Sequence, residues 1–182
     1  MVEIVNMTYY VNLNCKLNLE FIAKSLDNVR YDKKKFSAAI KRIKDPKCSI
    51  LIFNNGKLII TGCKSEDQCN IVSQKIAESI QRIGYEVRIT DRSVKNLVGS
   101  IDYGSNIDLF TLAKSIGPNA SFEPELFPGL IFSSKKINIK DGDKQNCKIT
   151  VFRSGKINIT GTKTKEELND AFSSIFYYLI EL

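Results

Sequence analysis

Residues 53–64 read F-N-N-G-K-L-I-I-T-G-C-K, and residues 152–163 read F-R-S-G-K-I-N-I-T-G-T-K. The two stretches share the frame F-x-x-G-K-x-x-I-T-G-x-K and lie 99 positions apart. A second matching pair, F-S-A-A-I at 36–40 and F-P-G-L-I at 127–131, is offset by 91. The chain is therefore an internal duplication, and two copies are too few for a solenoid. We expect a single fold with pseudo-twofold symmetry.

The boundary between the two copies is predicted near residue 92. Asn6 in the first copy corresponds to Asn96 in the second, at an offset of 90. We therefore expect one continuous domain made of a first repeat, 1–92, and a second repeat, 93–182. The wider offset of the opening frame implies about eight extra residues in the second copy. We place this insertion at 135–146, where a D-G turn joins two strands.

Each copy shows the same order of expected elements: a strand, a short helix, three strands and a long closing helix. In the first copy the strands and the short helix are expected at residues 5–13, 18–27, 36–43, 49–53 and 57–62. The first strand and short helix of the second copy are expected at 94–102 and 106–116. Antiparallel strands and helices in this order predict an α+β domain.

The two long helices carry clear start signals. S-E-D-Q at 65–68 and T-K-E-E at 164–167 are predicted capping boxes, and Gly84 is predicted to end the first helix. The buried stripe of the first helix is expected at Ile71, Val72, Ile76, Ile80 and Ile83, and that of the second at Leu168, Ala171, Phe172, Ile175 and Leu179. Both stripes are expected to pack on one face of the sheet.

The other face of the sheet is predicted to bind a partner. Strand alternation places Leu58 and Ile60 on one side and Lys57, Ile59 and Thr61 on the other. One set must meet the long helices, yet the second set also contains an isoleucine. Helices cover only one side, so an apolar residue on the uncovered side indicates a binding surface.

Two pairs of phenylalanines and the chain's charge indicate the kind of partner. In antiparallel hairpins, Phe36 is expected beside Phe53, and Phe127 beside Phe152. The chain carries a formal net charge of +7 and a pI near 9.1, which favours anionic partners such as nucleic acid. A flat apolar sheet with cationic borders and aromatic wedges suits the minor groove of DNA, where apolar rings enter base steps and kink the duplex.

Several other classes of protein are disfavoured by composition. The chain has no histidine, and its five cysteines occur without C-x-x-C spacing, so we expect reduced thiols, no metal site and no cofactor. It also lacks the G-x-x-x-x-G-K-[ST] and G-x-S-x-G motifs, and we expect it not to be an enzyme. No run of residues approaches transmembrane length and the N-terminus lacks signal-peptide features, so no membrane association and a cytosolic or nuclear location are expected.

Nearly the whole chain resembles the TATA-box-binding protein family. The resemblance rests on V-N-L-N-C-K-L-N-L near residue 11, I-F-N-N-G-K-L-I-I-T-G-C-K-S-E-D, Q-R-I-G-Y, K-N-L-V-G-S-I-D and above all F-E-P-E-L-F-P-G-L-I at 122–131. It implies a pseudo-twofold saddle, in which a curved ten-stranded antiparallel sheet carries four helices on its convex face. It also implies a general transcription initiation factor that binds TATA-type promoter DNA and nucleates preinitiation complex assembly.

The resemblance implies roles for individual residues on the concave face. The intercalating wedges would be Phe36, Phe53, Phe127 and Phe152. Minor-groove contacts would come from Asn6, Thr8, Ile59, Thr61, Asn96, Val98, Thr150, Asn158 and Thr160. Phosphate contacts would come from Lys35, Arg42, Lys57, Lys64, Lys156 and Lys163. If six phosphates are neutralised, log K should fall with log salt at a slope of about −5.

Protein partners are implied in the same way: RNA polymerase machinery, a TFIIB-like factor and a TFIIA-like factor. Glu123, Glu125 and Leu126 match the family's TFIIB-binding patch. Lys75 and Arg82 match positions that bind TFIIA, although a neighbouring basic position is Asn70 here. For all of these residues, a solvated charged surface is the alternative interpretation.

Departures from the family pattern leave a second function open. Thr8, Thr150 and Asn158 stand where the family has aliphatic residues, Tyr10 replaces a small residue, and Ser133 replaces a phosphate-binding arginine. These changes predict weaker or less discriminating DNA binding. The alternative is a family-related DNA-binding regulator or scaffold with weakened TATA preference.

Two further expectations concern the free protein and its source. An apolar concave face without DNA favours self-association as a homodimer. Abundant isoleucine and asparagine fit a compact unicellular eukaryote, with a nuclear location, or a large DNA virus, with a viral factory in the cytoplasm.

Overall fold

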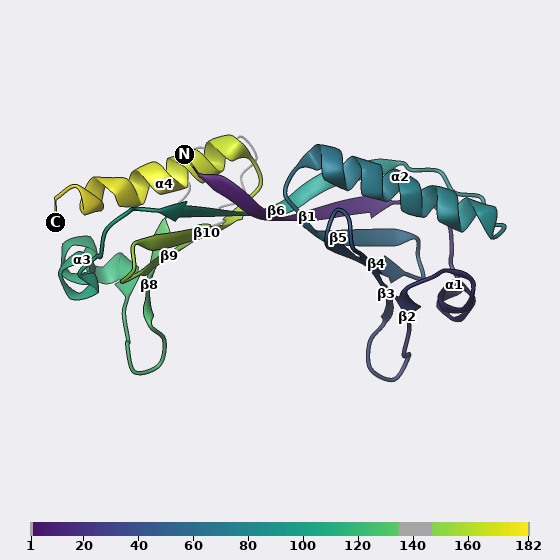
Figure 1. The fold of residues 1–182 in the computed structure, drawn as a ribbon, viewed down its shortest axis with the longest axis horizontal. Coiled ribbons are helices and arrows are strands. Elements are labelled where there is room, and N and C mark those ends of the chain that lie inside the picture. Colours follow the sequence, from purple (N-terminus) through teal and green to yellow (C-terminus); the bar gives the residue numbers. More distant parts are fainter. Residues whose placement is uncertain (1, 135–146, 182) are drawn as a thin grey trace. The chain divides into compact units, whose positions relative to one another are not determined.

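The computed structural model describes residues 2–134 and 147–181, and these residues form ten strands and four α-helices (Figure 1). The strands are β1 (Glu3–Asn12), β2 (Val29–Arg30), β3 (Ala38–Ile43), β4 (Cys48–Phe53), β5 (Lys57–Cys63), β6 (Asp91–Asp102), β7 (Ala120–Ser121), β8 (Gly129–Ser134), β9 (Cys147–Phe152) and β10 (Lys156–Thr162). The helices are α1 (Leu19–Ser25), α2 (Glu66–Arg82), α3 (Leu109–Ile116) and α4 (Lys165–Leu179), with a 3₁₀ turn η1 at Gly117–Asn119. The insertion expected at 135–146 lies outside the described residues.

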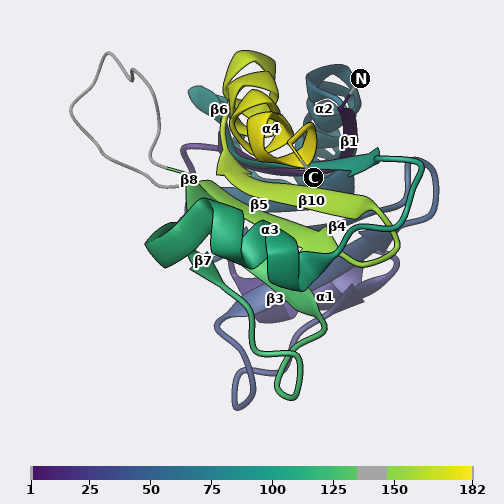
Figure 2. The same cartoon turned by 90° about the vertical axis from the view of Figure 1, so that its left-hand side faces the viewer.

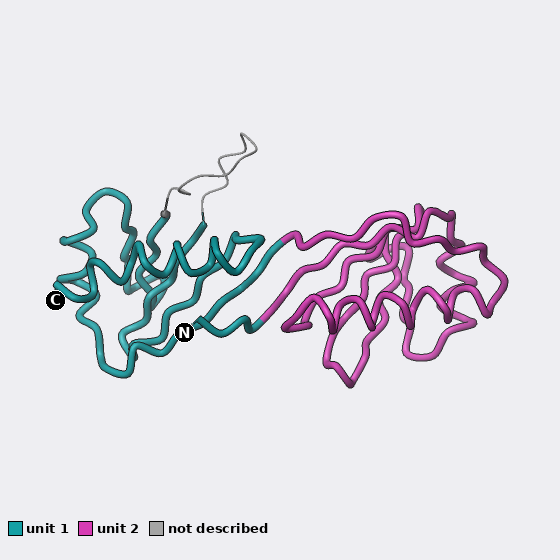
Figure 3. The backbone as a smooth tube through the Cα atoms, turned by 90° about the horizontal axis from the view of Figure 1, so that it is seen from above, with its two compact units in different colours: residues 1–5, 96–182 teal, residues 6–95 magenta. Residues whose placement is uncertain are grey.

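The strands follow the order β2-β3-β4-β5-β1-β6-β10-β9-β8-β7. The chain divides into two compact units, unit 2 with residues 6–95 and unit 1 with residues 1–5 and 96–182 (Figure 3). The first residues of β1 thus belong with the second half of the chain, where Val2 and Ile4 pack against the core of unit 1. The predicted α+β class is confirmed, with the same set of elements in each unit.

Residue patterns located the long elements but missed the short ones. β2 and β7 are two residues long, too short for a visible alternation. β3 begins at Ala38 and β8 at Gly129, so Phe36 and Phe127 lie in the preceding turns rather than at strand starts as expected. The predicted long helices are both present, with the expected start residues one position before the first helical residue.

Helices and strands pack through alternate residues within each unit. In β5, Leu58 and Ile60 are fully buried against the helical side, whereas Ile59 is only partly buried. Val72, Ile76 and Ile80 of α2 are buried as predicted, but Ile71 is 52% exposed and its assignment to the stripe was wrong. A step of one residue turns a helix by about 100°, so a residue next to Val72 points away from the sheet. Figure 2 shows the same layering in unit 1, with α4 above β6 and β10.

The glycine-lysine pair in each copy of the repeated frame is explained by a tight turn. Gly56 and Gly155 have φ of 80° and 87°, and their amides donate to the carbonyls of Phe53 and Phe152 at 3.0 and 2.9 Å. A Cβ at Gly56 would collide with the carbonyl oxygen of Cys15. Glycine is therefore required at this turn for conformation and for space.

The predicted N-caps form at both long helices, and the side chain three residues after each cap bonds one residue earlier than in a standard capping box. Ser65 Oγ accepts from the amide of Gln68 at 3.2 Å, and Thr164 Oγ1 accepts from the amide of Glu167 at 3.1 Å. Gln68 and Glu167 return a bond to the residue before the cap, accepting from the amides of Lys64 and Lys163 at 2.9 and 2.7 Å. Gly84 follows α2 with φ of 101° and donates to Gln81 at 2.9 Å, as expected for a helix end.

The cysteines are thiols, as predicted, and four of the five are buried. Burial, followed by the neighbouring Cys63, raises the pKa of Cys48 to about 12, so this thiol stays protonated at neutral pH. Among the described residues, no helix is long and apolar enough to cross a membrane.

Candidate nucleic-acid interface

The sheet face of unit 2 opposite its helices carries a continuous apolar row. Register pairs Ile40 with Leu51, Leu51 with Ile59, and Ile59 with Tyr10. Each of these residues is partly buried and alternates with core residues of the helical side. Lys95 Nζ lies 5.0 Å from the Tyr10 ring centroid, a cation–π contact that adds positive charge beside the row. We call this surface the open face of unit 2.

The equivalent row of unit 1 is largely polar. Register pairs Ile131 with Thr150, Thr150 with Asn158, and Asn158 with Ser100. The neighbours Ile149, Val151, Ile157 and Ile159 are fully buried on the helical side, so the row faces away from the core. Ser100 Oγ donates to Asn158 Oδ1 at 2.9 Å. This surface, the open face of unit 1, contains the predicted groove residues Thr150 and Asn158.

Asn6 and Asn96 occupy matching irregular points of the sheet. The register shifts between Met7 and Thr8 in β1, and between Ile159 and Thr162 in β10. Asn6 Oδ1 accepts from the amide of Gly62 at 2.8 Å, so the side chain satisfies a backbone donor that the ladder leaves unpaired.

Asn96 makes the matching bond in unit 1, and each asparagine also bonds to a threonine hydroxyl. Asn96 Oδ1 accepts from the amide of Gly161 at 2.8 Å in the same way. Thr61 Oγ1 donates to Asn6 Oδ1 at 3.3 Å, and Asn96 Nδ2 donates to Thr160 Oγ1 at 3.5 Å. Because each Oδ1 is bound to a backbone amide, each Nδ2 lies on the other side of its side chain. An amide nitrogen carries two hydrogens, so Asn96 Nδ2 keeps one for an external acceptor beside its bond to Thr160.

The four phenylalanines lie outside the buried core. Phe36 is 44% exposed and Phe127 is 41% exposed. Phe53 and Phe152 are partly buried and alternate with the fully buried Ile52 and Val151, so they point to the open faces.

Only one of the two expected ring pairs forms a ring contact in the part of the chain that the structure describes. Phe127 and Phe152 are packed edge-on with centroids 6.0 Å apart. A Cβ at Gly129 would lie 2.7 Å from Phe127 Cε1 and 3.1 Å from Phe152 Cε1. The matching position in unit 2 is Ala38, which pairs with Phe53 and has such a Cβ. We attribute the difference between the two pairs to this methyl group.

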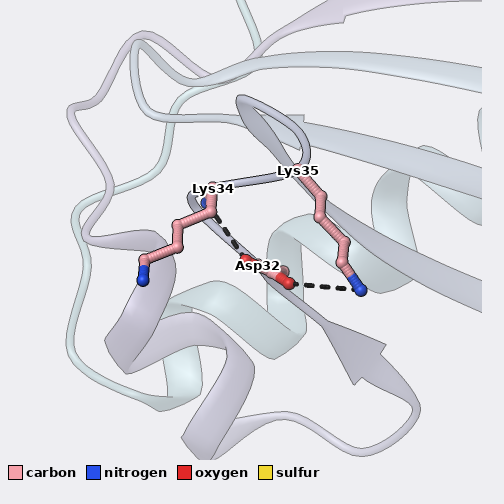
Figure 4. A network of polar contacts seen from close by, with 3 residues as sticks. All are labelled: Asp32, Lys34 and Lys35. Carbon is pink, nitrogen blue, oxygen red and sulfur yellow. Dashed lines mark hydrogen bonds and ion pairs between the residues drawn. The ribbon is translucent and has the colours of Figure 1, made fainter.

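The turn before Phe36 is organised by Asp32. Asp32 Oδ1 accepts from the amide of Lys34 at 3.0 Å (Figure 4). The carbonyl of Asp32 accepts from the amides of Lys35 and Phe36. Lys35 Nζ lies 3.7 Å from Asp32 Oδ2, and both side chains are largely exposed. A surface ion pair of this kind is weak, so Lys35 can exchange it for another anion.

The matching turn before Phe127 has the same backbone bonds and the opposite charge. The carbonyl of Glu123 accepts from the amides of Leu126 and Phe127 at 3.0 and 2.9 Å. Glu123 and Glu125 are exposed, and Leu126 is 81% exposed. Two carboxylates beside a leucine disfavour phosphate contact and fit a protein partner with apolar and basic groups.

The six predicted phosphate-binding cations are all exposed: Lys35, Arg42, Lys57, Lys64, Lys156 and Lys163. In β3, Arg42 pairs with Ser49 of β4, whereas the matching Ser133 of β8 pairs with Lys148 of β9. The positive charge that appeared to be missing at Ser133 is therefore carried by the neighbouring strand. Sequence reasoning missed Lys148 because only the strand register places it beside Ser133.

The predicted TFIIA-binding residues lie on the exposed side of α2. Lys75 and Arg82 are both exposed, whereas Asn70 is turned toward the core and its Oδ1 accepts from Tyr9 Oη at 3.0 Å. Burial raises the pKa of Tyr9, so its hydroxyl is a stable donor at neutral pH. The missing basic residue at position 70 is explained by this internal hydrogen bond.

An apolar row in unit 2 and aromatic rings in both units, on a sheet face without helices and with exposed cations nearby, are typical of proteins that bind the minor groove of DNA with strands. A sequence model described as "Transcription factor TFIID (or TATA-binding protein, TBP)" matches residues 1–83 and 91–182. The chain therefore belongs to the TATA-box-binding protein family, a family of transcription factors and not of enzymes.

Individual relatives agree with this assignment. The TATA-box-binding protein of Candida albicans is 44% identical over 176 residues, covering 97% of this chain and 71% of that protein. Those of Saccharomyces cerevisiae and Schizosaccharomyces pombe are 43% and 42% identical over the same length, with 70% and 73% of each covered. Among solved structures, Methanococcus jannaschii TBP matches with a TM-score of 0.83 and 28% identity, over 100% of this chain and 99% of that one.

Proposed function

We propose that this protein is a general transcription initiation factor that binds TATA-type promoter DNA through the open faces of its two units. Family membership supports DNA binding, and the observation that carries the choice of surface is the uncovered apolar row of unit 2. Ile40, Leu51, Ile59 and Tyr10 lie side by side and only partly buried, although the helices pack on the other side of the sheet and leave this row uncovered.

The proposed contacts follow from the arrangement of side chains. Nδ2 of Asn6 and of Asn96 would donate to the acceptors that every base pair shows in the minor groove, adenine N3 or thymine O2 in A·T pairs. Thr8, Thr61, Val98 and Thr160 would contact the groove around them, because strand alternation puts each on the same side as its open-face neighbours. Phe36, Phe53, Phe127 and Phe152 would enter base steps and kink the duplex. The exposed cations would bind phosphates and make affinity strongly dependent on salt.

Partner binding is proposed for two other surfaces. Glu123, Glu125 and Leu126 would bind a TFIIB-like factor, because this turn repels phosphate and exposes an apolar side chain. Lys75 and Arg82 would bind a TFIIA-like factor. The two repeats are proposed to be residues 1–92 and 93–182, the location is proposed to be the nucleus, and the DNA-free protein is proposed to form a homodimer through its open faces.

The experiment that tests this function measures DNA affinity and DNA bending with a doubly labelled TATA duplex. We expect the double variant Phe36→Ala with Phe127→Ala to lower affinity at least about tenfold and to reduce the bend, since each ring no longer enters a base step. Phe21→Ala is the matched control, because Phe21 is 45% exposed and lies on α1 rather than on an open face. Equal bending by the double variant and the control would refute the proposed surface.

A further inference from the structure

The open faces of the two units differ in what they offer to a base pair. The row in unit 2 is Ile40, Leu51, Ile59 and Tyr10, of which the first three are purely apolar. The row in unit 1 is Ile131, Thr150, Asn158 and Ser100. The duplicated frame places Asn158 at the position of Ile59, and Thr150 at that of Leu51.

The hydrogen bond between Ser100 and Asn158 fixes the direction of the amide. Ser100 Oγ donates to Asn158 Oδ1 at 2.9 Å, which leaves the Nδ2 group pointing away from β6. Oδ1 keeps a second lone pair, and the hydroxyl oxygens of Ser100 and Thr150 are further acceptors. The row in unit 1 therefore offers both donors and acceptors, whereas the three apolar residues of the row in unit 2 offer neither.

The two kinds of base pair differ in just this respect. In the minor groove an A·T pair presents acceptors only, whereas a G·C pair adds the guanine N2 amino group, a donor. Against an apolar row this amino group loses its water and gains no partner, which is costly. Against the row in unit 1 it finds acceptor oxygens, so the cost is largely offset.

We propose that Asn158, positioned by Ser100, determines specificity by letting unit 1 accept a G·C pair that unit 2 rejects. This inference rests on the proposed function, because it requires the open faces to contact DNA. It makes the preferred site asymmetric: strictly A·T under unit 2 and tolerant of G·C under unit 1. Asn158 would touch the base pair, and Ser100 would act through Asn158 as a positioning residue.

The test uses three duplexes that differ from an all-A·T site: a G·C pair in one half, in the other half, or in both. Affinities are measured at one salt concentration by fluorescence anisotropy. We expect either single G·C pair to cost wild type less than about threefold, because the complex adopts the orientation that places unit 1 over it. Two G·C pairs should cost at least about tenfold, since one pair must then meet unit 2.

Variants separate the proposed role from a general loss of stability. Asn158→Val should raise the cost of a single G·C pair to at least about tenfold, because both rows are then apolar at that position. Ser100→Ala should raise it by about threefold, through loss of a single orienting hydrogen bond. Asn169→Val is the control, the same substitution at an exposed position of α4, and should keep the wild-type ratios. Because each ratio compares duplexes on one protein, a partly unfolded variant changes all affinities and leaves the ratio intact.

Two failures are distinguishable with a fourth variant, Ile59→Glu, which places a charge in the apolar row of unit 2. If Ile59→Glu binds every duplex as wild type does, the open faces do not bind DNA and the proposed function fails together with this inference. If Ile59→Glu abolishes binding but wild type and Asn158→Val pay the same cost for a single G·C pair, the inference alone is overturned.

Discussion

The two units are alike on the helical side of the sheet, where the core is packed, and differ on their open faces. On the helical side, fully buried Leu58 and Ile60 of unit 2 have fully buried counterparts in Ile157 and Ile159 of unit 1. On the open side, an apolar row faces outward in unit 2 and a hydrogen-bonded polar row faces outward in unit 1. Core packing tolerates little change in volume, so it keeps both copies the same, whereas the open faces are limited by what they bind.

The turns before Phe36 and Phe127 show the same contrast. Both are closed by amides that donate to a carbonyl four residues before the phenylalanine. The four residues before the phenylalanine are D-K-K-K in unit 2 and E-P-E-L in unit 1. The same backbone turn therefore carries positively charged side chains in unit 2 and negatively charged side chains in unit 1. The duplicated fold therefore has two sets of positions that are equivalent in structure and specialised in function.

The largest expected effect is on stability, and it should be equal in the two units. Ile60→Ala and Ile159→Ala should each lower the free energy of unfolding by about 2 to 5 kcal/mol, because both side chains are fully buried and leave a cavity. Ile71→Ala is the control, since Ile71 is 52% exposed, and should cost less than about 1 kcal/mol. Denaturant unfolding of the three variants measures this. A loss in one unit only would show that the two cores are not equivalent.

The next effect is on the electrostatics of DNA binding. Glu123→Lys with Glu125→Lys gives the turn of unit 1 the charge of the turn in unit 2. We expect DNA affinity to rise about tenfold and the slope of log K against log salt to steepen by about 2, as two more phosphates are neutralised. A salt series on one duplex measures both quantities.

The same charge change elsewhere provides the control for that prediction. Glu166→Lys with Asp170→Lys alters exposed positions of α4, away from the open face of unit 1. It should leave the slope nearly unchanged, because contacts rather than net charge release bound counterions. If both double variants steepen the slope equally, the turn before Phe127 does not lie close to DNA phosphates and the prediction is wrong.

A smaller effect is expected on affinity for an all-A·T duplex. Asn158→Val should strengthen binding about fivefold, or by ~1 kcal/mol. In the complex the Asn158 amide loses its water, and an A·T pair offers no donor to the second lone pair of Oδ1. Valine does not carry this cost. The reverse change in unit 2, Ile59→Asn, should weaken binding by a similar factor. Titration of each variant at one salt concentration measures the difference. If Asn158→Val binds the all-A·T duplex no more tightly than wild type does, the polar side chain of Asn158 does not weaken binding and this prediction is wrong.

The long elements of the fold could be predicted from the residues alone. Repeated glycine-lysine frames located the hairpins, because Gly56 and Gly155 are needed for a positive φ in a crowded turn. Capping residues located the starts of α2 and α4. The exposed position of Ile71 was missed, since an isoleucine beside Val72 fits a stripe in sequence while pointing elsewhere on the helix.

The candidate interface could be predicted only in part. Alternation along β5 indicated that Ile59 faces away from the core, and the two hairpins indicated the four phenylalanines. Family resemblance supplied the remaining positions. Strand register was needed for Lys148, which restores a charge beside Ser133, and for Ser100, which orients Asn158. Cross-strand neighbours are far apart in the chain, and no local pattern specifies which residues will be opposite each other.

The smallest expected effect concerns the helix caps, which belong to the helical side, where the two units are alike. Ser65→Ala and Thr164→Ala should each lower stability by about 0.5 to 1 kcal/mol, because each removes an acceptor from a backbone amide of the first turn. Denaturant unfolding measures both, with Ser65→Thr and Thr164→Ser as controls that keep the hydroxyl and should recover most of the loss. Equal losses fit two equivalent helical layers. A loss at Ser65 with none at Thr164 would mean that Glu167 sustains the start of α4 without its cap, since this carboxylate also accepts from the Lys163 amide at 2.7 Å.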